Sequence, residues 1–155
     1  MTVDYDALLD EVRALMDGEP DAVANAANVT AVLFHNLPDL NWAGFYMLRG
    51  DVLVLGPFQG RPACVRIPLG QGVCGAAATQ RRTIVVPDVH AFPGHIACDP
   101  ASRSEIVIPL LYGGTLLGVL DLDSPRPDRF GPADQAGLET VAAAYAHHRP
   151  ENTGG

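Results

Sequence analysis

The stretch at residues 105–124, "EIVIPLLYGGTLLGVLDLDS", contains two apolar runs separated by a pair of glycines. Runs rich in valine, isoleucine and leucine are typical of β-strands, and a two-glycine turn between them is typical of a β-hairpin. We therefore predict two antiparallel strands, at 105–112 and 115–124. This pair indicates a fold that is built on an antiparallel sheet.

A second hairpin precedes the first in the chain. The segments "NWAGFYML" at 41–48 and "VLVLGPF" at 52–58 flank the tight turn "RGD". Shorter strands are predicted at 62–69 and 83–89. Strands joined by short hairpins at both ends of the set favour an antiparallel sheet over the parallel sheet of nucleotide-binding folds.

Helical segments complete the pattern. Apolar residues recur at helical spacing near the N-terminus, and an alanine-rich run follows "GQGVCG". We predict the α+β class, with a central antiparallel six-stranded sheet flanked by helices in a single domain over residues 1–155. Its parts are a helical N-terminus at 1–37, the sheet and active-site loops at 41–124, and a C-terminal helix at 132–148.

The composition excludes several classes of protein. The 155 residues carry a formal net charge of −8, and the cations are all arginine. An acidic chain without a basic cluster argues against binding to nucleic acid or to an anionic membrane surface. The N-terminus lacks the basic and apolar regions of a signal peptide, and no apolar run reaches the roughly 18 residues of a membrane span. We therefore expect a cytoplasmic protein.

The chain has three cysteines, which are too few for a disulfide scaffold. No two of them form a Cys-x-x-Cys pair, so a structural zinc site is not expected. Cys74 lies near the start of a predicted helix, where backbone N–H groups and the helix dipole favour a thiolate. Local chemistry therefore predicts that Cys74 is the most acidic thiol, with packing as a small core residue as the alternative.

The other two cysteines give weaker local signals. Cys64 lies at the start of a predicted strand, and its residue type alone favours a position in the core. Cys98 lies in a loop at 90–104 that is long enough to suggest a functional role. The adjacent Asp99 would raise the pKa of this thiol rather than lower it, so its activation would have to come from other groups.

Three carboxylates lie close to the ends of the predicted hairpin strands. Glu105 is expected at the sheet edge nearest the long loop. Asp121 and Asp123 alternate with a leucine, so both project from one face of the last strand. They form either a solvated strand end or a small acidic pocket.

Trp42 and Tyr46 likewise share one face of the first strand, where core packing is the default interpretation.

Three longer stretches, taken together, resemble a known family. They are "LGPFQGRPACVRIPLGQGVCGAA", "DVHAFPGHIACDPASRSEIVIPL" and "GVLDLDS", with "NWAGFY" on the first strand. These motifs strongly resemble the free methionine-(R)-sulfoxide reductases, which are small GAF-domain enzymes. The resemblance covers roughly residues 41–145, and it implies a GAF-like fold for the chain.

The resemblance also implies roles for the candidate residues. It makes Cys98 the nucleophile, Cys64 the resolving thiol that forms a disulfide with it, and Cys74 a third thiol able to replace or shuttle the disulfide. It makes Glu105, Asp121 and Asp123 the substrate-binding carboxylates, with Trp42 and Tyr46 lining the pocket. The resemblance and the local chemistry therefore favour different cysteines, Cys98 and Cys74, as the reactive thiol.

The implied reaction is the thiol-dependent reduction of free L-methionine (R)-S-oxide to L-methionine, through a cysteine sulfenic acid and an intramolecular disulfide. Its partners are the free sulfoxide and thioredoxin or a similar dithiol reductant, and it needs no metal and no organic cofactor. GAF domains often pair through their terminal helices, which is compatible with a homodimer. The alternative is a GAF-type sensor of a small ligand or of thiol redox state, which binds without turnover.

Overall fold

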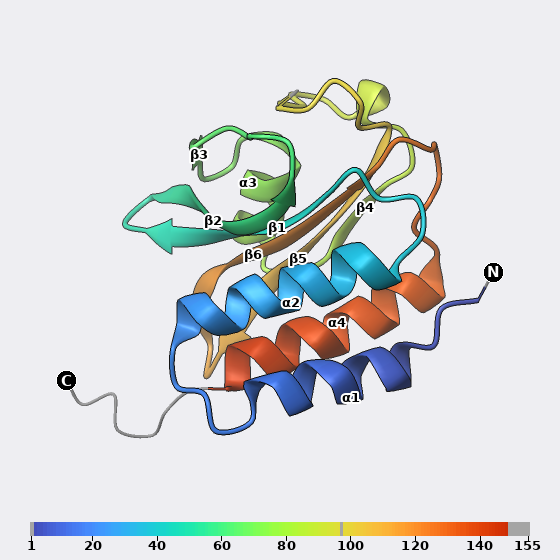
Figure 1. Ribbon diagram of the computed structural model, residues 1–155. Helices are drawn as coiled ribbons and strands as arrows, with labels where there is room; N and C mark the ends of the chain where they lie inside the picture. The colour runs from blue at the N-terminus through green and yellow to red at the C-terminus, as the bar shows by residue number, and fades with distance from the viewer. Residues whose placement is uncertain (1, 97, 149–155) are drawn as a thin grey trace.

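The computed structural model describes residues 2–96 and 98–148 and shows a curled six-stranded sheet with helices on both faces (Figure 1). In chain order, the elements are α1 (Tyr5–Met16), α2 (Ala22–Asn36), β1 (Trp42–Arg49), β2 (Val52–Gly60), β3 (Arg66–Pro68), α3 (Gly72–Gln80), β4 (Ile84–Val86), a 3-10 turn (Val89–Ala91), β5 (Ser104–Tyr112), β6 (Thr115–Ser124) and α4 (Pro132–His147). The strand order is β3-β2-β1-β6-β5-β4, with antiparallel pairing throughout. The predicted α+β class and the antiparallel sheet are confirmed.

Side chains that alternate along the strands divide the core into two apolar clusters. On one face, Phe45, Ile106 and Leu122 pack against α1, α2 and α4. On the other face, Tyr46 and Val107 pack against α3 and the short strands. Figure 1 shows the three long helices side by side below the sheet and α3 on the opposite side. Because the strand period is two, neighbouring residues in one strand serve opposite faces.

The helix starts follow ordinary capping chemistry. The side chain of Asp4 accepts a hydrogen bond from the Ala7 N–H at 3.0 Å, and Asp21 accepts one from the Ala24 N–H at 2.9 Å. Each bond satisfies a backbone donor that has no partner within the helix. Among the described residues, no helix combines the length and the apolar character that crossing a membrane would require.

The two short strands are shorter than the sequence predicted. The strand expected at 62–69 comprises only Arg66–Pro68, because Pro62 has no N–H to donate and the Cys64 carbonyl group accepts a hydrogen bond from the Tyr46 side chain of β1 instead of from a neighbouring strand. The strand expected at 83–89 ends at Val86, since the next residue is a proline, which cannot donate to a ladder.

Helix α4 packs closely on α1 at Gly137. A Cβ atom on Gly137 would lie 2.1 Å from Cγ of Tyr5, whose hydroxyl donates to Asp134 at 2.6 Å. We expect Gly137→Ala to lower the free energy of unfolding by about 1–3 kcal/mol, because the added methyl group overpacks this contact. Urea unfolding followed by circular dichroism measures the effect.

The Tyr5→Ala background provides the control for this prediction. With the ring removed, the Gly137→Ala change should cost nothing further, since alanine has the higher helix propensity. An equal loss of stability in both backgrounds would mean that the ring contact is not the cause.

Candidate functional site

The site is a cavity of about 40 Å³ between α3 and the face of the sheet that α3 covers. This volume exceeds the space that a single water molecule needs, which is about 10–15 Å³ by the same kind of measure. Strands β1, β5 and β6, the N-terminal turn of α3 and the loop before β5 contribute to its wall. The lining residues are Trp42, Tyr46, Ala63, Ile67, Gln71, Gly72, Val73, Cys74, His95, Ile96, Cys98, Asp99, Ser102, Glu105, Asp121 and Asp123.

Strand register brings the three predicted carboxylates together. Glu105 on β5 is directly opposite Asp123 on β6, and Asp121 lies two residues before Asp123 on the same face. The three side chains are buried, with exposed fractions of 6%, 5% and 8% for Glu105, Asp121 and Asp123. The alternative of a solvated strand end is therefore wrong, and the acidic pocket is the observed arrangement.

Burial and mutual repulsion raise the pKa of both aspartates. For Asp121 the main cause is loss of hydration, followed by the charges of Asp123 and Glu105. For Asp123 it is again loss of hydration, followed by the charge of Glu105 and a hydrogen bond with it. Carboxyl groups that share a hydrogen bond must retain a proton between them. The cavity therefore holds at least one carboxylic acid that can donate a proton.

One oxygen of this acidic group has no partner. Asp121 Oδ1 is buried and accepts no hydrogen bond from any described residue. A group that can carry a positive charge lies beside Glu105, since His95 Nε2 is 3.7 Å from Glu105 Oε1. A buried acceptor without a donor costs about 1–3 kcal/mol, so a ligand that brings a donor to it gains binding energy.

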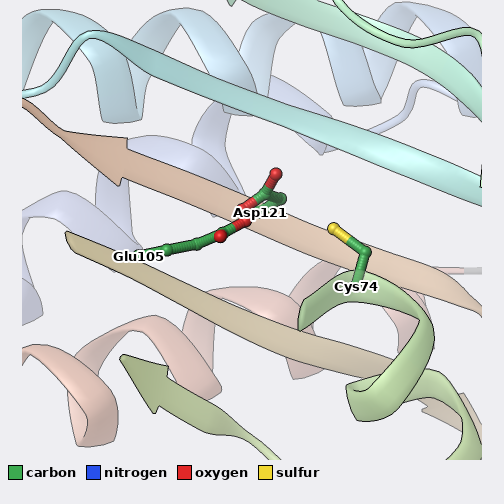
Figure 2. Close-up of side chains that lie close together, drawn as sticks. All are labelled: Cys74, Glu105 and Asp121. Carbon is green, nitrogen blue, oxygen red and sulfur yellow. The ribbon is translucent and has the colours of Figure 1, made fainter. Parts of the chain in front are cut away.

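Cys74 lies against these carboxylates, and the expectation that the start of the helix makes its thiol acidic is wrong. It lies in the first turn of α3 as expected, but its side chain is buried and points toward Asp121 (Figure 2). Burial and the charges of Asp121 and Glu105 raise the pKa of the thiol well above its ordinary value. Burial and the anionic surroundings outweigh the helix dipole, and Cys74 stays protonated as a hydrogen-bond donor to Asp121.

The same group can also hold a cation. One donor atom each from Cys74, Glu105 and Asp121 lie within 4.8 Å of one another (Figure 2). A thiol and two carboxylates suit a divalent ion of the zinc type, and carboxylates alone suit an ammonium group. The donor atoms of the cluster therefore suit a cation, and the expected independence from metals stays a prediction.

The other two cysteines form a disulfide at the rim of the cavity. Cys64 and Cys98 are joined, with their Cα atoms 5.5 Å apart, although 34 residues separate them in sequence. Cys64 follows β2, and Cys98 lies in the loop before β5. The structure thus brings Cys98, Cys74 and the three carboxylates around one cavity, with Cys64 bonded to Cys98 at its edge.

A polar network holds the loop that carries Cys98. The Asn41 amide nitrogen donates to Asp99 Oδ2 at 2.9 Å and to Ser102 Oγ at 3.0 Å. The backbone N–H of Asn41 donates to the Asp123 carbonyl oxygen at 3.0 Å, so the anchor is itself tied to β6. These contacts fix the described residues around Cys98 against the sheet.

Asn41 and His95 were not among the site residues predicted from the sequence. The single His-x-x-Cys step before Cys98 was the available signal for His95, and it is weak. Asn41 gave no signal, because its partners lie about sixty positions away in the chain. Its role depends on tertiary structure that local patterns do not contain.

The buried aspartates lead to a prediction about stability. Their pKa values are raised in the folded protein, so between about pH 4 and the raised values the folded state binds more protons than the unfolded state. Stability therefore falls as the pH rises through this window. We expect Asp121→Asn to be more stable than the parent by about 1–2 kcal/mol near pH 8, with the difference vanishing toward pH 4.

Urea unfolding over a series of pH values tests this expectation. The exposed Asp51 provides the matched control, because Asp51→Asn should leave the pH dependence unchanged. A loss of stability in Asp121→Asn at high pH would contradict the proposed charge repulsion.

Comparisons with known proteins agree with this geometry. The GAF domain family matches residues 5–148. The free methionine-R-sulfoxide reductase of Escherichia coli is 52% identical over 139 residues, which are 90% of this chain and 84% of that protein. This match exceeds what a shared fold alone would give.

Two solved structures are similar over nearly the whole chain. A proposed GAF sensor protein from Burkholderia vietnamiensis has 57% identity and a TM-score of 0.91, covering 94% of this chain and 92% of that one. The free methionine-R-sulfoxide reductase of Neisseria meningitidis, solved in complex with its substrate, has 43% identity and a TM-score of 0.91, covering 96% and 92%. The chain therefore belongs to the GAF-domain family and, within it, to the free methionine-R-sulfoxide reductases.

Proposed function

We propose that the protein reduces free L-methionine (R)-S-oxide to L-methionine, with Cys98 as nucleophile and Cys64 as resolving thiol. The observation that carries this proposal is the Cys64–Cys98 disulfide at the rim of a buried cavity that contains three carboxylates. Reduction of a sulfoxide by thiols needs two sulfur atoms that can be joined and a proton donor beside them. The cavity has both.

The first step forms methionine. The Cys98 thiolate attacks the sulfoxide sulfur, a proton passes to the sulfoxide oxygen, and the oxygen leaves with Cys98 as a sulfenic acid. The sulfur of the substrate is reduced by two electrons and Cys98 is oxidised by two. Asp123 is our candidate for the acid, because its raised pKa keeps it able to donate near neutral pH.

The second step forms the disulfide. The Cys64 thiol condenses with the sulfenic acid of Cys98 to give the disulfide and one molecule of water. A dithiol of the thioredoxin type then opens this bond by exchange and is itself oxidised to a disulfide. The Cα separation of 5.5 Å lies within the range that a disulfide requires.

The same carboxylates account for a preference for the free amino acid. Free methionine sulfoxide brings an ammonium group, whereas the same residue within a polypeptide has a neutral amide. Asp121 Oδ1, which accepts no hydrogen bond within the described part of the chain, is a suitable acceptor for that cation. We place the ammonium group against Asp121 and Glu105, and the S-methyl group against Trp42.

The direct test is turnover. The purified protein is supplied with free methionine-R-sulfoxide and a dithiol reductant, and methionine is measured by amino-acid analysis, with the S epimer as control. Continuous formation of methionine from the R epimer supports the proposal. A GAF-type sensor would bind the sulfoxide without producing methionine, and that outcome would refute the proposed enzyme.

The remaining expectations follow from this chemistry. A dithiol reductant is needed in each cycle, which fits the predicted cytoplasmic location and a partner of the thioredoxin type. That location, that partner and the homodimer stay predictions. Mixed-disulfide trapping with a thioredoxin that lacks its resolving cysteine tests the partner.

A further inference from the structure

The segment that carries Cys64 is held by two aromatic side chains and by a backbone hydrogen bond from the Leu55 N–H to the Val65 carbonyl oxygen at 2.9 Å. It connects β2 to β3 over residues 61–65 and has no regular secondary structure. The Trp42 indole Nε1 donates to the Arg61 carbonyl oxygen at 3.1 Å, and the Tyr46 hydroxyl donates to the Cys64 carbonyl oxygen at 2.8 Å. A strand neighbour would satisfy these carbonyl groups in a sheet, so the aromatic side chains replace that neighbour here.

The Tyr46 ring has little freedom to move. It is buried and stacks on Trp42 with ring centroids 5.9 Å apart, and Trp42 stacks in turn on Phe58 at 5.3 Å. The end of β2, directly before the segment, approaches this stack closely, because a Cβ atom on Gly60 would lie 2.7 Å from Cδ1 of Trp42. The hydroxyl therefore presents a fixed donor to the backbone of Cys64.

The hydroxyl also stays protonated. Burial raises the pKa of Tyr46, and the negative charge of Asp121 raises it further. A tyrosine that does not ionise remains a hydrogen-bond donor at every pH at which the protein works. The carbonyl group of Cys64 is therefore bound in all states of the surrounding carboxylates.

We propose that Tyr46 is a positioning residue for the formation of the disulfide, because its hydroxyl holds the Cys64 backbone where the thiol can reach Cys98. This inference rests on the proposed function and adds a step-specific role to it. The condensation joins Cys64 Sγ to Cys98 Sγ and releases water, so its rate depends on how often the two sulfur atoms meet. Without the hydrogen bond, the irregular segment at 61–65 samples positions in which they do not.

The test is Tyr46→Phe, which removes the hydroxyl and keeps the ring. Reduced enzyme is mixed with one equivalent of free methionine-R-sulfoxide. The release of methionine and the loss of free thiols are followed on the same samples. We expect disulfide formation to slow about tenfold more than methionine release, the rate factor that corresponds to about 1.4 kcal/mol. The sulfenic acid of Cys98 should accumulate and react with a dimedone probe.

Two further variants calibrate the result. Cys64→Ser gives the limit at which Cys64 does not resolve the sulfenic acid. Tyr145→Phe is the matched control, because its hydroxyl donates to the Ala22 carbonyl oxygen at 3.1 Å on the opposite face of the sheet. We expect it to show the parent rates in both steps. A small monothiol, which attacks the sulfenic acid directly, should shrink the difference between Tyr46→Phe and the parent.

The outcomes distinguish a failure of the proposed function from a failure of the positioning role of Tyr46. Failure of the parent to release methionine refutes the proposed function. Release of methionine by the parent with equal slowing of both steps in Tyr46→Phe overturns the positioning role and assigns Tyr46 to the substrate. Unchanged disulfide formation in Tyr46→Phe also overturns it.

Discussion

Cys98→Ser is expected to reduce kcat/KM for free methionine-R-sulfoxide by at least about a thousandfold, because a serine hydroxyl is far less nucleophilic than a thiolate. The change leaves the carboxylates and the cavity in place, so substrate binding should persist without turnover. A coupled assay with excess dithiol reductant measures the rate, and equilibrium dialysis measures binding. Full activity in Cys98→Ser would refute the assignment of the nucleophile.

Cys64→Ser separates the attack of Cys98 on the substrate from the formation of the disulfide. This variant should form close to one equivalent of methionine per protein and then stop when only a thioredoxin-type protein is available. Peptide mapping after one turnover of the parent should find Cys64 linked to Cys98. A linkage that involves only Cys74 would transfer the resolving role to Cys74.

N-acetylation of the substrate is expected to lower kcat/KM by about ten- to a hundredfold relative to the free amino acid. The acetylated compound has no ammonium group, so the buried oxygens of Glu105 and Asp121 lose the donor that the free amino acid brings. The chain has no lysine to compensate for the negative charge in this cavity. Paired measurements on one preparation of enzyme give the ratio directly.

Glu105→Gln provides the control for this comparison. Removal of one charge should reduce kcat/KM for the free amino acid more than for the acetylated one, so the ratio between the two substrates should shrink. Equal kcat/KM values for both substrates in the parent would mean that the carboxylates do not bind the ammonium group. Their role would then be limited to acid catalysis or structure.

The order of strands and helices and the shared face of Asp121 and Asp123 could be predicted from sequence because they depend on local periodicity. A two-residue repeat in a strand fixes which side chains share a face, whatever the rest of the chain does. Trp42 and Tyr46 share a face for the same reason, and the structure stacks them at the cavity. Local pattern therefore determined which residues face the site.

The acidity of Cys74 could not be predicted in this way. The helix dipole is a local property, whereas the carboxylates that raise the pKa of Cys74 come from β5 and β6, more than thirty positions later. Such long-range charges become visible only when the sheet is assembled. The same limit applies to the segment at 61–65, where side chains of β1 bind the carbonyl groups of Arg61 and Cys64.

The disulfide between the segment at 61–65 and the loop before β5 also changes the polymer physics of the chain. It links cysteines 34 residues apart in sequence. By the chain-entropy relation, the lower entropy of the unfolded ensemble then stabilises the folded state by about 4 kcal/mol. In the proposed cycle, the enzyme would leave each turnover as a cross-linked chain and return to an open one when a reductant acts. The reduction potential of the disulfide and the folding stability of the protein are then linked. The reduced form, which is ready for substrate, is the less stable of the two.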